Sequence, residues 1–138
     1  SGEKLAATCG MDLHGNSSLH GHYSTYILGE PDGDVCQELS DAIHNQRTWI
    51  CKGPLLEVHN DGEALTFTIH QTGKPGYEPL AEDDYKITLR TKDQVLTCNV
   101  SDRIPLTSFA EHAIIIPMLF EKEAIIENLV CTSPVIHL

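Results

Sequence analysis

The stretch that decides the fold is PLLEVHNDGEALTFTIHQTGKPGYEPLAEDDYKITLRTKDQVLTCNVS, residues 54–101. Apolar residues stand at every second position in four runs of this stretch, which is the period of a strand with one buried face. The alternating positions are Leu56 and Val58, then Leu65, Phe67 and Ile69, then Tyr85, Ile87 and Leu89, then Leu96, Cys98 and Val100. The pattern predicts an antiparallel meander of four strands.

The connections between these strands carry signals of their own. Asp61-Gly62 is a hairpin pair, because glycine readily adopts the backbone angles of a tight turn. The middle connection, residues 72–84, is long and contains the acidic run at residues 82–84. Carboxylates can hold a hard cation, but this run lacks the spaced pattern of a calcium loop. We therefore interpret it as a solvated loop.

One amphipathic helix is expected over residues 34–46. Asp34 suits its N-cap, with Gln37 at the capping-box position three residues later. The apolar positions recur at helical spacing and form one stripe of about three turns. They are Val35, Leu39, Ala42 and Ile43. Asn45 is a suitable residue for the end of the helix.

Three more segments have strand character. They are residues 22–28, 48–51 and 113–120, and the last of these is apolar enough to be buried. Pro117 cannot donate a hydrogen bond, so we expect that strand to lie at an edge or to contain a bulge. Residues 121–138 fit a helix and a strand almost equally well, and the choice between them stays open.

The predicted elements define the fold class. A sheet with one covering helix is an α+β arrangement, here an antiparallel sheet of about five to seven strands with the main helix packed on one face. The length is typical of one domain, so residues 1–138 are predicted to form a single domain. Residues 1–19 are rich in glycine and serine and are expected to be irregular.

Charge limits the classes of partner. The 138 residues contain nine Lys and Arg against twenty Asp and Glu, a formal net charge of −11. Nucleic-acid affinity depends on Lys and Arg neutralising phosphates, so a nucleic-acid partner is not expected. A membrane partner is not expected either, because anionic lipid repels this charge and no apolar run approaches the ~20 residues of a membrane span. A basic partner protein suits the charge.

The cysteines indicate the compartment. There are five, at Cys9, Cys36, Cys51, Cys98 and Cys131. An odd, scattered set without a CxxC pair does not look like a disulfide framework. Cys36 falls on the apolar side of the predicted helix and Cys98 on the apolar side of a strand, so we expect buried free thiols and a cytoplasmic protein. A secreted protein with one or two disulfides is the alternative.

The densest group of potential metal ligands lies near the N-terminus. It comprises Cys9, Asp12, His14, His20 and His22. His20 and His22 have i, i+2 spacing, so on a strand both imidazoles point to one face. With the other three residues folded across them they would form a transition-metal site for zinc or iron. The competing interpretation is a set of ordinary surface histidines.

Two other arrangements have catalytic potential. Cys51, with Lys52 beside it and His44 upstream, has the composition of a thiolate nucleophile with its base. A cysteine in such a setting more often belongs to the core. His59 and His70 flank the first hairpin, and we expect them at different heights and out of contact.

The outward positions of the predicted meander are polar. They are Thr66, Thr68, His70, Lys86, Thr88, Arg90, Thr97 and Asn99. Such a face can bind a ligand or a partner strand, but threonine is also favoured on exposed strand positions for its branched shape. We interpret it as a solvated face.

Three functional hypotheses follow. The first is a non-catalytic protein-interaction module, such as an inhibitor, an immunity-type protein or an adaptor, which would expose an acidic patch or an apolar groove. The second is a small metal-dependent or His/Cys-dependent enzyme that uses the N-terminal ligand group. The third is a subunit of a homo-oligomer, because residues 114–138 contain more aliphatic side chains than a small sheet easily buries.

Overall fold

The computed structural model describes residues 23–29 and 32–138. In these ranges it has one α-helix, α1 (Val35–His44), and ten strands. The strands are β1 (Ser24–Tyr26), β2 (Trp49–Cys51), β3 (Pro54–Asn60), β4 (Ala64–Gln71), β5 (Tyr85–Arg90), β6 (Val95–Cys98), β7 (Ile104–Pro105), β8 (Ile114–Glu121), β9 (Leu129–Thr132) and β10 (Ile136–His137). Short 3-10 helices span Glu82–Asp84, Leu106–Ser108 and Ile126–Asn128.

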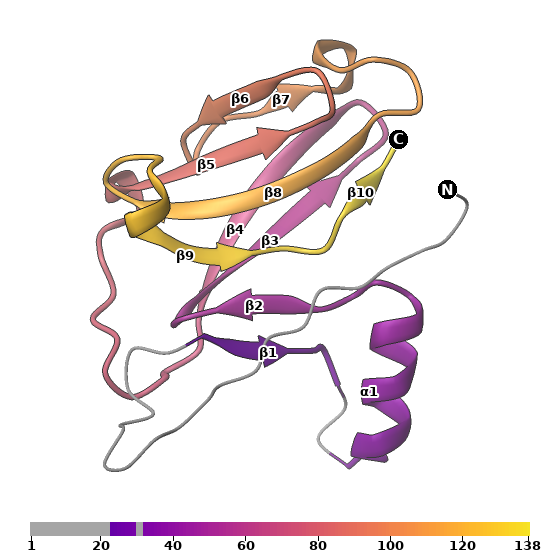
Figure 1. The fold of residues 1–138 in the computed structure, drawn as a ribbon, viewed down its shortest axis with the longest axis vertical. Helices are drawn as coiled ribbons and strands as arrows, with labels where there is room; N and C mark the ends of the chain where they lie inside the picture. The colour runs from indigo at the N-terminus through magenta and orange to yellow at the C-terminus, as the bar shows by residue number, and fades with distance from the viewer. Residues whose placement is uncertain (1–22, 30–31) are drawn as a thin grey trace.

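The strands form two antiparallel sheets (Figure 1). The larger sheet has seven strands in the order β1-β2-β9-β8-β5-β6, with β10 also paired to β8. The smaller sheet has three strands in the order β3-β4-β7. The predicted α+β class, with one helix and antiparallel sheet, is confirmed.

The four strands of residues 54–101 are present, but they do not form one continuous meander. β3 pairs with β4 in the small sheet, and β5 pairs with β6 in the large one. The connection at residues 72–84 therefore passes from one sheet to the other. Each hairpin has a single apolar face, and stacking two sheets lets these faces bury each other. Alternation is the same in either arrangement, which is why it does not distinguish them.

The core lies between the two sheets and draws on both. Leu56 and Leu65 of the small sheet are fully buried, as are Ile87, Leu89 and Leu119 of the large sheet. One core shared by both sheets explains how a chain with only one helix covers its apolar strand faces.

The connection at residues 72–84 is anchored to this core through Tyr85, which is 1% exposed. The Tyr85 hydroxyl lies 2.7 Å from the Tyr77 hydroxyl and accepts the backbone N–H of Leu80 at 3.0 Å. Burial, together with the hydrogen bond to Tyr85, raises the pKa of Tyr77 well above its usual value. The Tyr77 ring also packs against Gly53, where an added Cβ would stand 2.3 Å from the ring carbon Cγ.

Helix α1 begins and ends as expected. The Asp34 carboxylate accepts the backbone N–H groups of Cys36 and Gln37 at 3.0 and 3.2 Å, and Asn45 is the C-cap. Its position differs from the prediction, because it lies beside β1 and β2 at one end of the molecule rather than across a sheet (Figure 1).

Most of the helix's apolar stripe is consequently exposed. Val35 is 72% exposed, Leu39 41% and Ile43 39%, whereas Ala42 is buried. Cys36 is exposed as well, which corrects its expected burial. Amphipathic spacing identifies the apolar side of a helix but does not say what covers it. No helix in the described ranges is long and apolar enough to cross a membrane.

Pro117 does not occupy an edge strand. It is fully buried in β8, between β5 and β9. Its carbonyl accepts the N–H of Ser133 at 3.1 Å, so its nitrogen faces the residues that follow β9. β9 has ended there, and β10 first pairs with β8 at Ile136, opposite Ile115. The missing N–H therefore falls where the neighbouring chain changes from one strand to the next.

The end of the chain is strand rather than helix. β9 and β10 occupy most of residues 129–137, preceded by the single 3-10 turn Ile126–Asn128. β9 inserts between β2 and β8, and so joins the N-terminal strands to the rest of the large sheet.

Candidate functional site

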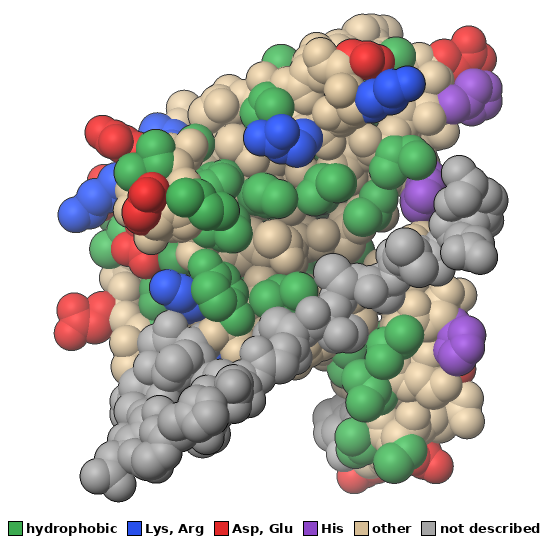
Figure 2. All heavy atoms as spheres, in the orientation of Figure 1, with side chains coloured by type: hydrophobic (Ala, Val, Ile, Leu, Met, Phe, Trp, Pro, Cys, Tyr) green, Lys and Arg blue, Asp and Glu red, His purple; other side chains and the backbone are tan. Residues whose placement is uncertain are grey.

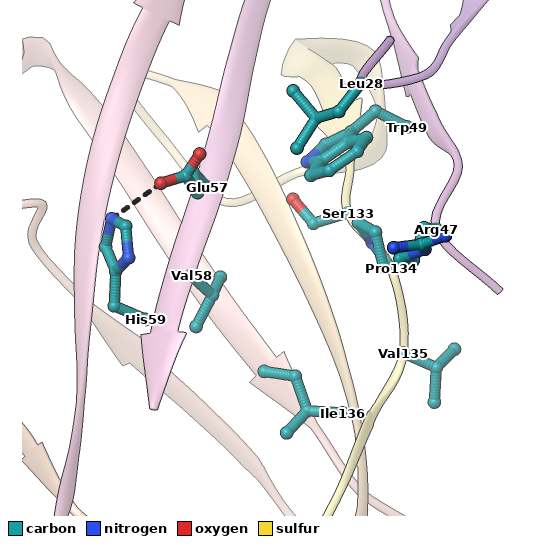
Figure 3. Close-up of a pocket in the computed structure, with 10 residues that line it drawn as sticks. All are labelled: Leu28, Arg47, Trp49, Glu57, Val58, His59, Ser133, Pro134, Val135 and Ile136. Atoms are coloured by element: carbon teal, nitrogen blue, oxygen red, sulfur yellow. Dashed lines mark ion pairs between the residues drawn. The ribbon is translucent and has the colours of Figure 1, made fainter. Parts of the chain in front are cut away.

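A groove lies between β3, the segment that links β9 to β10, and the chain between α1 and β2 (Figure 3). Its volume is about 400 Å³, within the range of about 300–1,000 Å³ that ligand sites occupy. It is lined by Leu28, Arg47, Trp49, Glu57, Val58, His59, Ser133, Pro134, Val135 and Ile136. We call it the Trp49 groove. Most of its wall is apolar.

The floor of the groove is fixed by a shared hydrogen-bond acceptor. The backbone carbonyl of Leu56 accepts the indole N–H of Trp49 at 2.8 Å and the hydroxyl of Ser133 at 2.6 Å. The Leu56 N–H donates to the Cys131 sulfur at 3.5 Å. Side chains of β2 and of the chain around β9 thus occupy the outer edge of β3 at Leu56, where another strand would otherwise pair.

Beyond Leu56, no strand in the described ranges pairs with the outer edge of β3. Backbone N–H and C=O groups alternate in direction along a strand, so those of Val58 and Asn60 face the same side as those of Leu56. The hairpin agrees with this alternation, because Asp61 donates its N–H to Ala64 across the turn at 3.3 Å. In the described part of the chain, the backbone groups of Val58 and Asn60 have no hydrogen-bond partner on the outer side.

Charged groups border the groove on two sides. Arg47 lines the groove (Figure 3) and forms no ion pair with any residue that the structure describes. Glu57, on the opposite side, is engaged by two histidines. Its Oε1 lies 2.9 Å from His59 Nε2, and its Oε2 lies 3.4 Å from His70 Nε2. Among the described residues that line the groove, Arg47 is therefore the cation available to a ligand carboxylate.

His59 and His70 stand at different heights of the hairpin, as expected, since His59 lies opposite Thr66 and His70 opposite Leu55. Glu57 joins them, because Glu57 and His59 share one face of β3 at i, i+2 spacing. His70 stands opposite Leu55 and is therefore the diagonal neighbour of Glu57 across the hairpin. Glu57 was missed because its role depends on strand register, although the Asp61-Gly62 turn carries a signal for that register.

This histidine–carboxylate cluster is not a metal centre. Across the described residues, no group of three His, Cys, Asp or Glu side chains could hold a metal ion. The predicted ligands Cys9, Asp12, His14, His20 and His22 all lie outside the described residues. The zinc or iron site, and the metal-dependent enzyme built on it, therefore stay predictions.

Cys51 is a core residue, and His44, the base predicted for it, lies on the exposed surface. Cys51 is fully buried, whereas His44 contacts the backbone carbonyl of Ser40 on its own helix at 2.7 Å. The Lys52 amino group sits over the Tyr23 ring, 5.0 Å from its centre. The proposed nucleophile and its base are thus separated, and the burial of Cys51, Cys98 and Cys131 is confirmed.

The predicted polar face is divided between two sheets. Thr66, Thr68 and His70 lie on β4 in the small sheet, so they share no surface row with β5 and β6. Thr88 is buried rather than solvated, flanked by Thr97 and Met118 as its cross-strand partners.

The acidic run at residues 82–84 is an exposed 3-10 turn, in agreement with a solvated loop.

Comparison with known proteins provides no counterpart. No family model matches the chain, and no curated protein or solved structure matches it. The chemistry of the Trp49 groove is therefore the starting point for a function.

Proposed function

We propose that this protein is a non-catalytic interaction module that binds an extended segment of a partner protein in the Trp49 groove. The observation that carries the proposal is the outer edge of β3, where the backbone groups of Val58 and Asn60 face outward beside the groove and have no hydrogen-bond partner among the described residues. An extended peptide satisfies such groups by adding a strand, and pockets beside the edge select alternate side chains.

The lining of the groove indicates the sequence of that segment. Val58, Val135 and Ile136 provide apolar wall, which favours a branched aliphatic or aromatic side chain pointing inward. Arg47 favours an acidic residue at the end of the segment nearest α1, because a guanidinium pairs well with a carboxylate. We infer a short extended motif that combines an apolar residue with an acidic one.

The partner as a whole is proposed to be a basic protein. A net charge of −11 steers positively charged molecules toward the surface and raises their association rate at low salt. The same charge disfavours nucleic acid. We place the encounter in the cytoplasm, since buried free thiols suit a reducing compartment.

Selection from a random peptide library displayed on phage tests the proposal. The library is selected on the wild-type protein and counter-selected on Val58→Pro, which removes the outward N–H of β3 without touching the bonds to β4. Proline is tolerated at a strand edge whose N–H is unpaired. We expect the selection to enrich peptides whose affinity for the wild-type protein is at least about tenfold higher than their affinity for the proline variant.

The matched control is Val58→Thr, which keeps the backbone N–H and the branched shape at that position. It should bind the enriched peptides about as well as wild type does. Equal enrichment on wild type and Val58→Pro, with both proteins folded by circular dichroism, would overturn strand addition at β3.

A second candidate function is self-association, and a specific surface favours it. Val95, Arg90 and Ile116 stand side by side across β6, β5 and β8. Val95 is 47% exposed, Ile116 36%, and Ile114, two residues along β8, 53%. Figure 2 shows hydrophobic side chains gathered over β8 on this face. We propose a second copy of the chain as the partner for this row.

Light scattering over a range of protein and salt concentrations tests self-association. The copies repel each other through their net charge, so salt should promote the dimer. Ile116→Lys is expected to prevent dimerisation. Ile126→Lys is the control, because Ile126 is 71% exposed and precedes β9 at the Phe120 end of β8, outside the row of Val95, Arg90 and Ile116. A wild-type protein that stays monomeric at every concentration would exclude this candidate.

A further inference from the structure

Cys51 and Cys131 stand directly opposite each other on β2 and β9. Lys52 donates its N–H to Val130 at 2.9 Å, so 52 and 130 form a hydrogen-bonded pair. The neighbouring pair, Cys51 and Cys131, is then of the non-hydrogen-bonded type, in which Cα atoms lie about 4.5 Å apart and side chains come closest. A disulfide requires a Cα separation of about 4.4–6.8 Å.

We propose that Cys51 and Cys131 are a redox-active pair that forms a cross-strand disulfide when the protein reacts with a small-molecule disulfide such as oxidised glutathione. Both thiols are fully buried, and each is the other's partner in the sheet register. This inference is independent of what the Trp49 groove binds.

The chemistry is two successive thiol–disulfide exchanges. The Cys51 thiolate attacks one sulfur of glutathione disulfide, whose S–S bond breaks and releases one glutathione thiolate. The Cys131 thiolate then attacks the Cys51 sulfur of the mixed disulfide and releases the second glutathione thiolate. Two protein thiols are oxidised and one glutathione disulfide is reduced. The two protons of the protein thiols end on the two glutathione molecules.

The surroundings support Cys51 as the attacking sulfur. A hydrogen bond from the Cys131 thiol lowers the pKa of Cys51, and the Gly53 backbone and the Lys74 charge act in the same direction. The same hydrogen bond, with burial, raises the pKa of Cys131. Glutathione disulfide can reach the two buried sulfurs only when β2 separates from β9. This separation involves few residues, because β2 is a three-residue strand near the margin of the sheet.

The disulfide would also act on the groove. Cys51 lies two residues after Trp49, and Cys131 lies two residues before Ser133. Trp49 and Ser133 both donate to the Leu56 carbonyl. A covalent bond between 51 and 131 therefore ties together the two strands that deliver these donors. Closing so long a loop should raise the midpoint of thermal unfolding by about 10 °C.

Refolding from denaturant in a glutathione redox buffer tests whether the two cysteines form a disulfide. Both thiols are exposed to glutathione in the unfolded chain, so their burial in the fold does not prevent the reaction. Free thiols are then alkylated, and the protein is digested and analysed by mass spectrometry. The expected result is a cross-linked peptide that joins residues 51 and 131, with Cys36 and Cys98 alkylated. The oxidised protein should melt at a higher temperature, and dithiothreitol should lower its melting temperature to that of the reduced protein.

Two variants make the result decisive. Cys98→Ser should keep the cross-link, because Cys98 lies on β6 away from β2 and β9. Cys51→Ser should lose both the cross-link and the redox-dependent shift in melting temperature. Alkylation of all thiols after refolding under oxidising conditions would overturn the proposal, and so would a disulfide that joins other cysteines while 51 and 131 stay reduced.

Discussion

Trp49 donates its indole N–H to the buried backbone carbonyl of Leu56 over 2.8 Å. Ser133, far along the chain, donates to the same oxygen. These two bonds connect Trp49 of β2 and Ser133, the residue after β9, to β3 of the small sheet; β2 and β9 both belong to the large sheet. The two sheets are thus joined at the floor of the Trp49 groove, and the open part of β3 begins immediately beyond this junction.

The two donors to Leu56 should be coupled energetically. Trp49→Phe and Ser133→Ala each leave the carbonyl one partner and should each cost about 1 kcal/mol of unfolding free energy, in addition to any loss of packing. The double variant leaves a buried carbonyl unsatisfied and should cost about 1–3 kcal/mol more than the sum. Urea unfolding of the four proteins gives the coupling directly. Strict additivity would show that the bonds act independently.

Gly53 should be intolerant of a side chain for a steric reason. An added Cβ would stand 2.3 Å from Cγ of Tyr77, so Gly53→Ala must displace the ring that anchors residues 72–84. We expect a loss of about 1–3 kcal/mol in unfolding free energy. In a Tyr77→Ala background the same change should cost less than about 0.5 kcal/mol. An equal loss of unfolding free energy in both backgrounds would show that the Tyr77 ring is not the cause of the loss.

Asp61 should make stability fall with acid. Its carboxylate accepts the N–H groups of Ala64 and Glu63 and pairs with Arg103, each at 2.8 Å. These contacts, with the Ala64 bond foremost, lower the pKa of Asp61 from 3.8 to about 2.

A depressed folded-state pKa gives stability that is present above the unfolded value and is lost as the pH falls from about 4 toward 2. The stability difference between wild type and Asp61→Asn should shrink through that window. An NMR titration of the Asp61 carboxyl with a midpoint near the unfolded value would contradict this account.

Local sequence signals predicted the elements well because their causes are local. The Asp34 carboxylate caps α1 through the next few N–H groups, and alternation identified β3 to β6. The sequence could not predict that these strands divide between two sheets, because a hairpin shows the same alternation whichever sheet it joins. The expectation that Pro117 marks an edge strand or a bulge was confirmed only in part. β8 is an inner strand, but its pairing with β9 shifts register between Leu119 and Phe120.

The groove was hidden from sequence reasoning because its parts come together only in the fold. Trp49 and Ser133 meet at Leu56 although they are far apart in the chain. Cys51 and Cys131 become neighbours only through the pairing of β2 with β9. Glu57 could have been found, because a hairpin register drawn from the Asp-Gly turn places it between His59 and His70.

The most direct test of strand addition at β3 is amide hydrogen exchange at Val58, followed by NMR with and without an enriched peptide. In the free protein the Val58 amide should exchange at least about a hundredfold faster than those of Glu57 and His59, which face β4. At a saturating peptide concentration, the exchange rate of the Val58 amide should fall to the range of the rates of Glu57 and His59. A Val58 amide already protected in the free protein, or one unaffected by bound peptide, would contradict the proposed mode of binding.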